Sequence, residues 1–264
     1  MARHRGTYKP GHKGPYELSR SRVEAFIKCP ACFWLDRGKG VKFPSIPAFL
    51  LNSNTDKLLK RDFNQYRGKA PHPIMIDNGL EDLIPFDHPD LPCWENSLSF
   101  GKDEHHFNTL HKETNILFGG GLDDVWQNTK TGELHIVDYK STSNQRKDPE
   151  PVSLEGKWKV AYKRQMDMYQ WIMRRKGFEV SEIGYFLYVD GLHIGYNGMI
   201  DSKDTTKALM HFDTSILEYR GSDDWVEQAL LDIKQLLTSD KQPGHGDECE
   251  HGRFIDQVVA LTEA

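Results

Sequence analysis

The sequence predicts an α/β fold of the mixed α+β kind, in which a central mixed sheet is flanked by helices. Three observations favour this fold. Helical spacing of apolar residues precedes a strand–turn–strand pattern at residues 118–140. A second long helical pattern follows at residues 154–176. Further strand patterns and a last helix at residues 223–237 complete the chain. Helices and strands in this order are typical of a sheet covered by helices.

The composition is that of an ordinary globular protein. The chain has 264 residues, of which 38% are hydrophobic and 28% charged, and this size favours one domain. No apolar run approaches the ~18 residues that span a bilayer, and the basic N-terminus lacks the apolar core of a secretory signal. Four cysteines do not make a disulfide framework in a chain this long. We therefore expect no membrane association and a cytoplasmic location.

The N-terminal residues 1–17 are rich in Gly, Pro, Arg, Lys and His and are expected to form a flexible basic arm, with phosphate contact as the alternative. Residues 18–264 are expected to form a single domain. The Ser21 to Glu24 spacing predicts a capping box for a helix that ends at Cys29. Prolines make residues 67–112 a loop-rich insertion, and a helical pattern precedes it at residues 50–66.

Residues 118–140 have the pattern of a β-hairpin. Apolar runs at 122–126 and 134–139 flank a polar segment that contains a glycine. A turn centred between residues 130 and 131 places Asp123 opposite Asp138. Directly opposed carboxylates destabilise a sheet unless they share a proton or a cation. Because side chains alternate along a strand, Lys140 shares the face of Asp138. Mg²⁺ and Mn²⁺, which prefer oxygen ligands, suit such a site.

The helix at residues 154–176 carries an apolar face that begins at Trp158, and Gln165 interrupts this face, so it needs a buried partner. Its basic flank includes Lys157, Lys163 and Arg164, which are expected either to be solvated or to contact phosphates. Strands are expected at 183–190 and 193–200, joined by an Asp190-Gly191 turn, and a third at 207–219.

Three motifs occur in a fixed order: GGLDDV at residues 120–125, VDYK at 137–140 and QMDMY at 165–169. Together they resemble the PD-(D/E)xK nuclease superfamily. The closest likeness is to its RecB-like branch, which includes CRISPR-adaptation exonucleases and the nuclease domains of recombination helicases. The resemblance covers roughly residues 19–254. It implies a restriction-endonuclease-like core and a divalent-metal-dependent deoxyribonuclease, exonuclease-like on DNA ends or single strands.

The resemblance also implies a role for individual residues. The metal ligands would be Asp123, Asp138 and the Tyr139 carbonyl. Asp56 aligns with a further ligand of the family, although an exposed acid in the first turn of a helix is the alternative. Lys140 would orient the attacking water or stabilise charge. Gln165 would reach the metal-bound water or a phosphate, and Tyr169 would position the nucleic-acid backbone.

A Cys-Pro segment near the N-terminus and a cysteine near the C-terminus resemble the family's iron–sulfur cluster segments. However, Gly252 stands where the second C-terminal thiolate is expected. A substitute set for zinc consists of Cys29, Cys32, Cys249 and His251, because zinc accepts three thiolates and an imidazole. The alternative is a decayed site whose cysteines are small reduced residues.

Two other classes of function remain open. The chain could be a non-catalytic nucleic-acid-binding or assembly protein on a nuclease fold, or a structural protein built on a metal cluster. The intact motifs favour the enzyme, because a protein that only binds has no reason to keep opposed carboxylates. The net charge of -5 means that DNA binding requires a local basic surface. DNA is the expected partner, and no prediction is made about protein partners.

Overall fold

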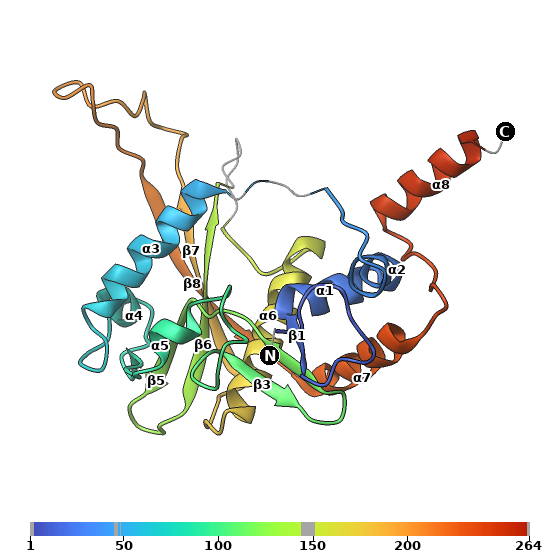
Figure 1. Cartoon of the computed structure of the whole chain (residues 1–264). Coiled ribbons are helices and arrows are strands. Elements are labelled where there is room, and N and C mark those ends of the chain that lie inside the picture. Colours follow the sequence, from blue (N-terminus) through green and yellow to red (C-terminus); the bar gives the residue numbers. More distant parts are fainter. Residues whose placement is uncertain (1–2, 45–46, 48, 144–150, 263–264) are drawn as a thin grey trace.

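Figure 1 shows the computed structural model, which describes residues 3–44, 47, 49–143 and 151–262. The helices are α1 (Arg20–Lys28), α2 (Pro30–Phe33), the π-helix η1 (Trp34–Gly38), α3 (Leu50–Asn64), α4 (Pro73–Asp77), α5 (Leu91–Trp94), α6 (Lys157–Arg175), α7 (Asp224–Thr238) and α8 (Glu250–Thr262). The strands are β1 (Tyr16–Ser19), β2 (Leu83–Pro85), β3 (Asn108–His111), β4 (Ile116–Gly119), β5 (Asp124–Asn128), β6 (Leu134–Thr142), β7 (Ile183–Gly191) and β8 (Phe212–Arg220).

The strands form two mixed sheets. The larger sheet has the order β2-β5-β6-β7-β8, and its only parallel pair among the described strands is β6 with β7. The smaller sheet has the order β1-β4-β3, with β1 parallel to β4. The predicted fold class, a mixed sheet flanked by helices, is therefore confirmed.

Helices cover the large sheet on both faces, as Figure 1 shows for α3 and α4 on one side and α6 on the other. Alternation along β6 explains this arrangement. Ile136 packs into the core beneath α6, whereas Val137 and Tyr139 pack with Phe63 of α3 and Met75 of α4. The site described below lies where β6 passes between these two layers.

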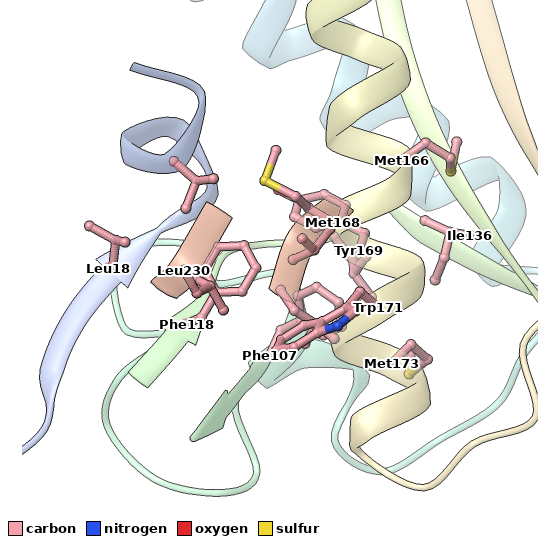
Figure 2. Packing of buried hydrophobic residues seen from close by; sticks show 14 of the residues in the cluster. Leu18, Phe107, Phe118, Ile136, Met166, Met168, Tyr169, Trp171, Met173 and Leu230 are labelled. Atoms are coloured by element: carbon pink, nitrogen blue, oxygen red, sulfur yellow. The ribbon is translucent and has the colours of Figure 1, made fainter. Parts of the chain in front are cut away.

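The α6 helix is the centre of the main core. Figure 2 shows Met166, Met168, Tyr169, Trp171 and Met173 around this helix, with further apolar side chains from the strands and from α7 packed nearby. The predicted helical face is thus largely buried. Its position relative to β6 is fixed by this packing, and so is the position of any polar side chain that α6 directs at the sheet.

The predicted turn at Asp190-Gly191 is wrong. The β7 strand continues through Gly191 and pairs antiparallel with β8 over nine residues. Residues 192–211 connect the two strands as the long arm visible in Figure 1, and the expected strand at 193–200 does not form there. The long β7–β8 ladder satisfies more backbone groups than a two-residue hairpin followed by a short third strand would.

Residues 3–17 make specific contacts that do not fit a flexible arm. The His4 and Tyr8 rings stack with centroids 5.5 Å apart, and the hydroxyl of Tyr16 donates a 2.6 Å hydrogen bond to the Gly6 carbonyl. Arg3 forms an ion pair with Glu17. These contacts hold the basic segment on the body of the protein next to β1.

The predicted capping box at Ser21 is also wrong. The helix α1 is capped at Ser19, whose side chain makes no capping hydrogen bond. Glu24 instead accepts two hydrogen bonds from Arg164 of α6, of 2.8 and 2.7 Å. The insertion at 67–112 contributes β2 and β3 to the two sheets, and α4 and α5 bury Met75, Leu91 and Trp94 in the cores.

Among the described helices, none is long and apolar enough to cross a membrane.

Candidate active site

The β5–β6 hairpin has the predicted register. Asp124 is opposite Val137, and Gln127 is opposite Leu134. Asp123 directly precedes β5, and its Oδ2 accepts a 2.9 Å hydrogen bond from the backbone N–H of Tyr139. This bond holds the Asp123 carboxylate beside Asp138, which is almost completely buried on β6. The hairpin therefore brings the two predicted acids together.

The neighbouring aspartates Asp123 and Asp124 have different environments. Asp124 is fully buried, and its Oδ1 lies 2.9 Å from Nη1 of Arg67. Its Oδ2 accepts a 2.7 Å hydrogen bond from the hydroxyl of Tyr139, on the opposite face of β6 from Asp138. Both oxygens of Asp124 are thus occupied by the fold. Asp123 is the carboxylate that remains accessible to a ligand.

Lys140 and Gln165 both contact Asp138. The Lys140 ammonium forms an ion pair with Oδ2 of Asp138, and Nε2 of Gln165 donates a 2.5 Å hydrogen bond to Oδ1. The predicted need of Gln165 for a buried partner is met by this bond. Lys140 Nζ also lies 4.6 Å from the ring centroid of Tyr162, within the range of a cation–π interaction. These contacts fix three side chains on one spot of the sheet.

The electrostatics of the site keep Lys140 charged. Burial alone would lower the pKa of Lys140, but the carboxylates of Asp138 and Asp123 oppose this effect and raise it overall. An ammonium with a raised pKa is a poor general base. Lys140 can therefore donate hydrogen bonds and stabilise negative charge.

Asp123 binds its proton unusually tightly. Burial and the neighbouring Asp138 raise the pKa of Asp123 to about 8, against the opposing effect of Lys140 and Lys60. At neutral pH Asp123 therefore retains its proton. A divalent cation would displace this proton, because ligands bind metals in their deprotonated form.

A second group of charged residues lies next to Asp123. Asp56 of α3 forms an i,i+4 ion pair with Lys60, whose Nζ is 3.5 Å from Oδ2 of Asp56. The same Nζ lies 3.9 Å from Oε2 of Glu95 and 4.0 Å from Oδ1 of Asp123. Burial raises the pKa of Glu95 although Lys60 opposes the shift. Lys60 thus links Asp56 to Asp123 through a shared ammonium, and the role of Asp56 as a metal ligand stays a prediction.

Sequence reasoning missed Lys60 and Glu95. Lys60 had a signal, since it lies one helical turn after Asp56 on a predicted helix. Glu95 had none, because it follows the short helix α5 inside the loop-rich insertion, and only the folded chain brings it to the hairpin.

The Tyr169 side chain is buried in the main core. Its ring packs edge-on against Phe107 with centroids 5.3 Å apart, and Figure 2 shows both rings. Burial raises the pKa of Tyr169, although a hydrogen bond with Arg20 opposes the shift. A Cβ atom at Gly120 would lie 3.1 Å from the Tyr169 hydroxyl oxygen, so the motif glycine lets the chain pass this side chain closely.

The sequence profile of the PD-(D/E)XK nuclease superfamily matches residues 87–254, which is more than half of the chain. The chain belongs to this superfamily. A search of curated proteins gave no match. The RecB-like motifs are consistent with the superfamily, and the matched region contains the β5–β6 hairpin and α6 but not α3. Asp56 and Lys60 are therefore outside the region that the superfamily profile supports.

In this PD-(D/E)XK chain, the cations predicted to bind nucleic acid have different partners. Nζ of Lys157 lies 2.8 Å from Oε1 of Glu248, and both side chains are exposed. Lys163 is 3.8 Å from Glu155. Arg164, by contrast, is committed to its two hydrogen bonds with Glu24 of α1. Arg164 therefore attaches α1 to α6, and the structure does not favour it as a phosphate contact.

Trp158 was expected on the buried face of α6, but its side chain is 87% exposed. It lies one turn before Tyr162 and two turns before Gln165, so it continues the helix face that lines the site. The tryptophan side chain nevertheless projects into solvent. An exposed indole next to a nuclease site can stack on a nucleobase.

The predicted cysteine set is brought together, with a different histidine. Cys29, Cys32, Cys249 and His245 place one ligand atom each within 4.8 Å of one another. His251 lies outside this group, and its ring packs against Phe43 instead. The ring of His245 can reach the cysteines because residues 239–249 fold back to the start of α2, whereas α8 directs His251 away.

The distances in this group fit one tetrahedral ion. Four of the six separations among the ligand atoms of His245 and the three cysteines are 3.4 to 3.7 Å, and all six are within 4.8 Å. A zinc ion with ~2.3 Å bonds to sulfur requires ligand separations of about 3.8 Å. Burial raises the pKa of Cys29, but backbone N–H groups of Gly246 and Cys32 and the nearby His245 lower it to about 6 overall. A thiolate, the form that binds metals, is thus favoured at Cys29.

Gly252 is part of the same arrangement. A Cβ atom at this position would lie 2.5 Å from Cγ of His245, which is a clash. The imidazole therefore occupies the space that a cysteine side chain would need. In the resemblance to the family, position 252 is where a thiolate is expected, and here the His245 ring stands in that place.

Proposed function

We propose that this protein is a divalent-metal-dependent deoxyribonuclease that hydrolyses phosphodiester bonds, with exonuclease-like action on DNA ends or single strands. The observation that carries the proposal is the meeting of Asp123, Asp138 and Lys140 at one point, with Gln165 bonded to Asp138. The PD-(D/E)XK family supports a nuclease in general. The metal, the DNA substrate and the exonuclease-like action are our extension.

The residues fit a hard divalent cation. Asp123 and Asp138 would hold Mg²⁺ or Mn²⁺, with the Tyr139 carbonyl and Asp56 as further oxygen ligands. Burial and the neighbouring Asp138 raise the pKa of Asp123, and a divalent cation between the two carboxylates would favour their ionised forms. When bound, such an ion lowers the pKa of its water and neutralises charge on the phosphate.

The protein side chains complete the chemistry. The Lys140 ammonium donates hydrogen bonds to the attacking water or to the phosphate and stabilises the charge that develops there. Gln165 keeps Asp138 in the orientation that ligation needs. Arg20, bonded to Tyr169 at the start of α1, adds a cation to the site. Arg20 would position the nucleic-acid backbone, and the buried Tyr169 would act with it by holding the Arg20 side chain in place.

A structural zinc ion, separate from the active site, would stabilise the fold. We propose that Cys29, Cys32, His245 and Cys249 bind one zinc ion, which ties α1 and α2 to the segment that leads into α8. The supporting observation is that all four ligand atoms fit the coordination sphere of a single ion. An iron–sulfur cluster contains several metal atoms and needs more space between its ligands. Reduced cysteines also agree with the proposed cytoplasmic location.

The experiment is cleavage of end-labelled linear and of circular single-stranded DNA in Mg²⁺, Mn²⁺ or EDTA. Loss of linear but not circular DNA, only with metal, is the expected result. Cutting of the circle would show endonuclease action at the same site. DNA binding without cleavage in any metal would overturn the proposal and favour a non-catalytic nucleic-acid-binding protein.

A further inference from the structure

Lys60 lies among three carboxylates from separate segments of the chain. Its Nζ is 3.5 Å from Asp56, 3.9 Å from Glu95 and 4.0 Å from Asp123. These distances exceed the ~2.7–3.2 Å of an N–H···O hydrogen bond. The ammonium is therefore a counter-ion shared by three acids, and not the hydrogen-bond partner of one. The side chain of Lys60 is only 16% exposed, so this charge is largely enclosed.

The two oxygens of Asp123 have different neighbours, and one of them is directed at a cation. Oδ2 accepts the N–H of Tyr139 on the side of Asp138 and Lys140. Oδ1 is directed at Lys60. Enzymes that use two metal ions hold them about 3.5–4 Å apart, which one carboxylate can bridge. If a first ion binds between Asp123 and Asp138, a second ion bridged by Asp123 would bind at its Oδ1. The Lys60 ammonium lies on this side of Asp123.

The charges of the site agree with this arrangement. The carboxylates of Asp56, Glu95, Asp123 and Asp138, together with the ammonium groups of two lysines, carry a net charge of -2 when all are ionised. One divalent ion balances this charge. A second divalent ion would have to bind next to an enclosed ammonium, without a further carboxylate among these residues to compensate it.

We propose that Lys60 is a permanent substitute for a second metal ion, and that the active site holds one divalent ion. This inference rests on the proposed function. The Lys60 ammonium supplies the positive charge that a second ion would supply, and it stabilises negative charge on the phosphate without being exchanged with solvent. The ion pair of Lys60 with Glu95 also explains why this carboxylate lies at the site, although Asp56, Asp123 and Asp138 suffice to hold one ion.

The test counts bound Mn²⁺ by titration calorimetry and detects pairs of ions by the dipolar broadening of the Mn²⁺ paramagnetic resonance signal. Wild type is compared with Lys60→Ala and with Lys60→Arg, which keeps the charge. An Asp123→Ala/Asp138→Ala variant gives the number of ions bound elsewhere, which is subtracted. Lys60→Met, which keeps the apolar stem, replaces Lys60→Ala if that variant does not fold.

We expect one Mn²⁺ above background in wild type and in Lys60→Arg, and two in Lys60→Ala with a broadened signal. Two ions in wild type, or a single ion in Lys60→Ala and Lys60→Met, would overturn the role of Lys60 and leave the proposed nuclease function standing. No Mn²⁺ above background in wild type would overturn the proposed function itself.

Discussion

Replacing Asp124 with asparagine should destabilise the fold, whereas the same change at Asp123 should not. Asp124 is fully buried, and its carboxylate is 2.9 Å from Arg67 and 2.7 Å from the hydroxyl of Tyr139. Removal of one partner from a buried ion pair costs about 3–5 kcal/mol, because the other charge stays buried without compensation. Arg67 is held in place by further hydrogen bonds to Asn64 and Phe86, so it cannot turn out to solvent freely.

For a chain of this size, about 3–5 kcal/mol corresponds to a fall in Tm of roughly 6–20 °C. Asp123→Asn removes a carboxylate that is repelled by Asp138, so we expect its free energy of unfolding to stay within about 1 kcal/mol of wild type. Thermal melts and urea unfolding without added Mg²⁺ measure both variants. Equal destabilisation by the two substitutions, or a stable Asp124→Asn protein, would refute this division of roles.

Three further predictions follow from the site. Because Asp123 has a raised pKa of about 8, the apparent Kd for Mg²⁺ should fall about tenfold per pH unit as the pH rises toward 8; calorimetry at pH 6, 7 and 8 that gives one constant value would contradict this. His245→Ala should lose one equivalent of zinc by elemental analysis, whereas His251→Ala should keep it. Loss of zinc in His251→Ala alone would show that His251, the histidine predicted from the sequence, is the ligand. Trp158→Ala should weaken single-stranded DNA binding by about 1–3 kcal/mol in fluorescence anisotropy, and unchanged affinity would mean that the exposed indole contacts no base.

The sequence predicts the hairpin well because its signals are local. The turn position and the alternation of side chains are enough to place Asp123 beside Asp138 and Lys140 on the same face, and the structure has this register. The helix α6 is equally easy to predict from the sequence, because its apolar spacing is regular and Gln165 is the polar residue that interrupts it. Both features depend on contacts between residues near one another in the chain.

The errors arise where distant contacts decide the outcome. The Asp190-Gly191 pair is a favourable turn, but pairing of β7 with β8 over nine residues overrides it. Arg164 is a basic residue on a predicted helix flank, and only the folded position of Glu24 shows that it is used within the protein. His245 and His251 are both near Cys249, and the choice between them depends on how the tail returns to α2.

The most direct test of the account is the rate of DNA hydrolysis by wild type, Lys140→Ala and Lys130→Ala at saturating Mg²⁺. Lys130 lies in the turn of the same hairpin, where it is exposed and paired with Asp82 at 2.6 Å, so it is a matched control. The account predicts that Lys140→Ala abolishes cleavage while the protein stays folded, and that Lys130→Ala cleaves like wild type. Full activity in Lys140→Ala would contradict the assignment of this site.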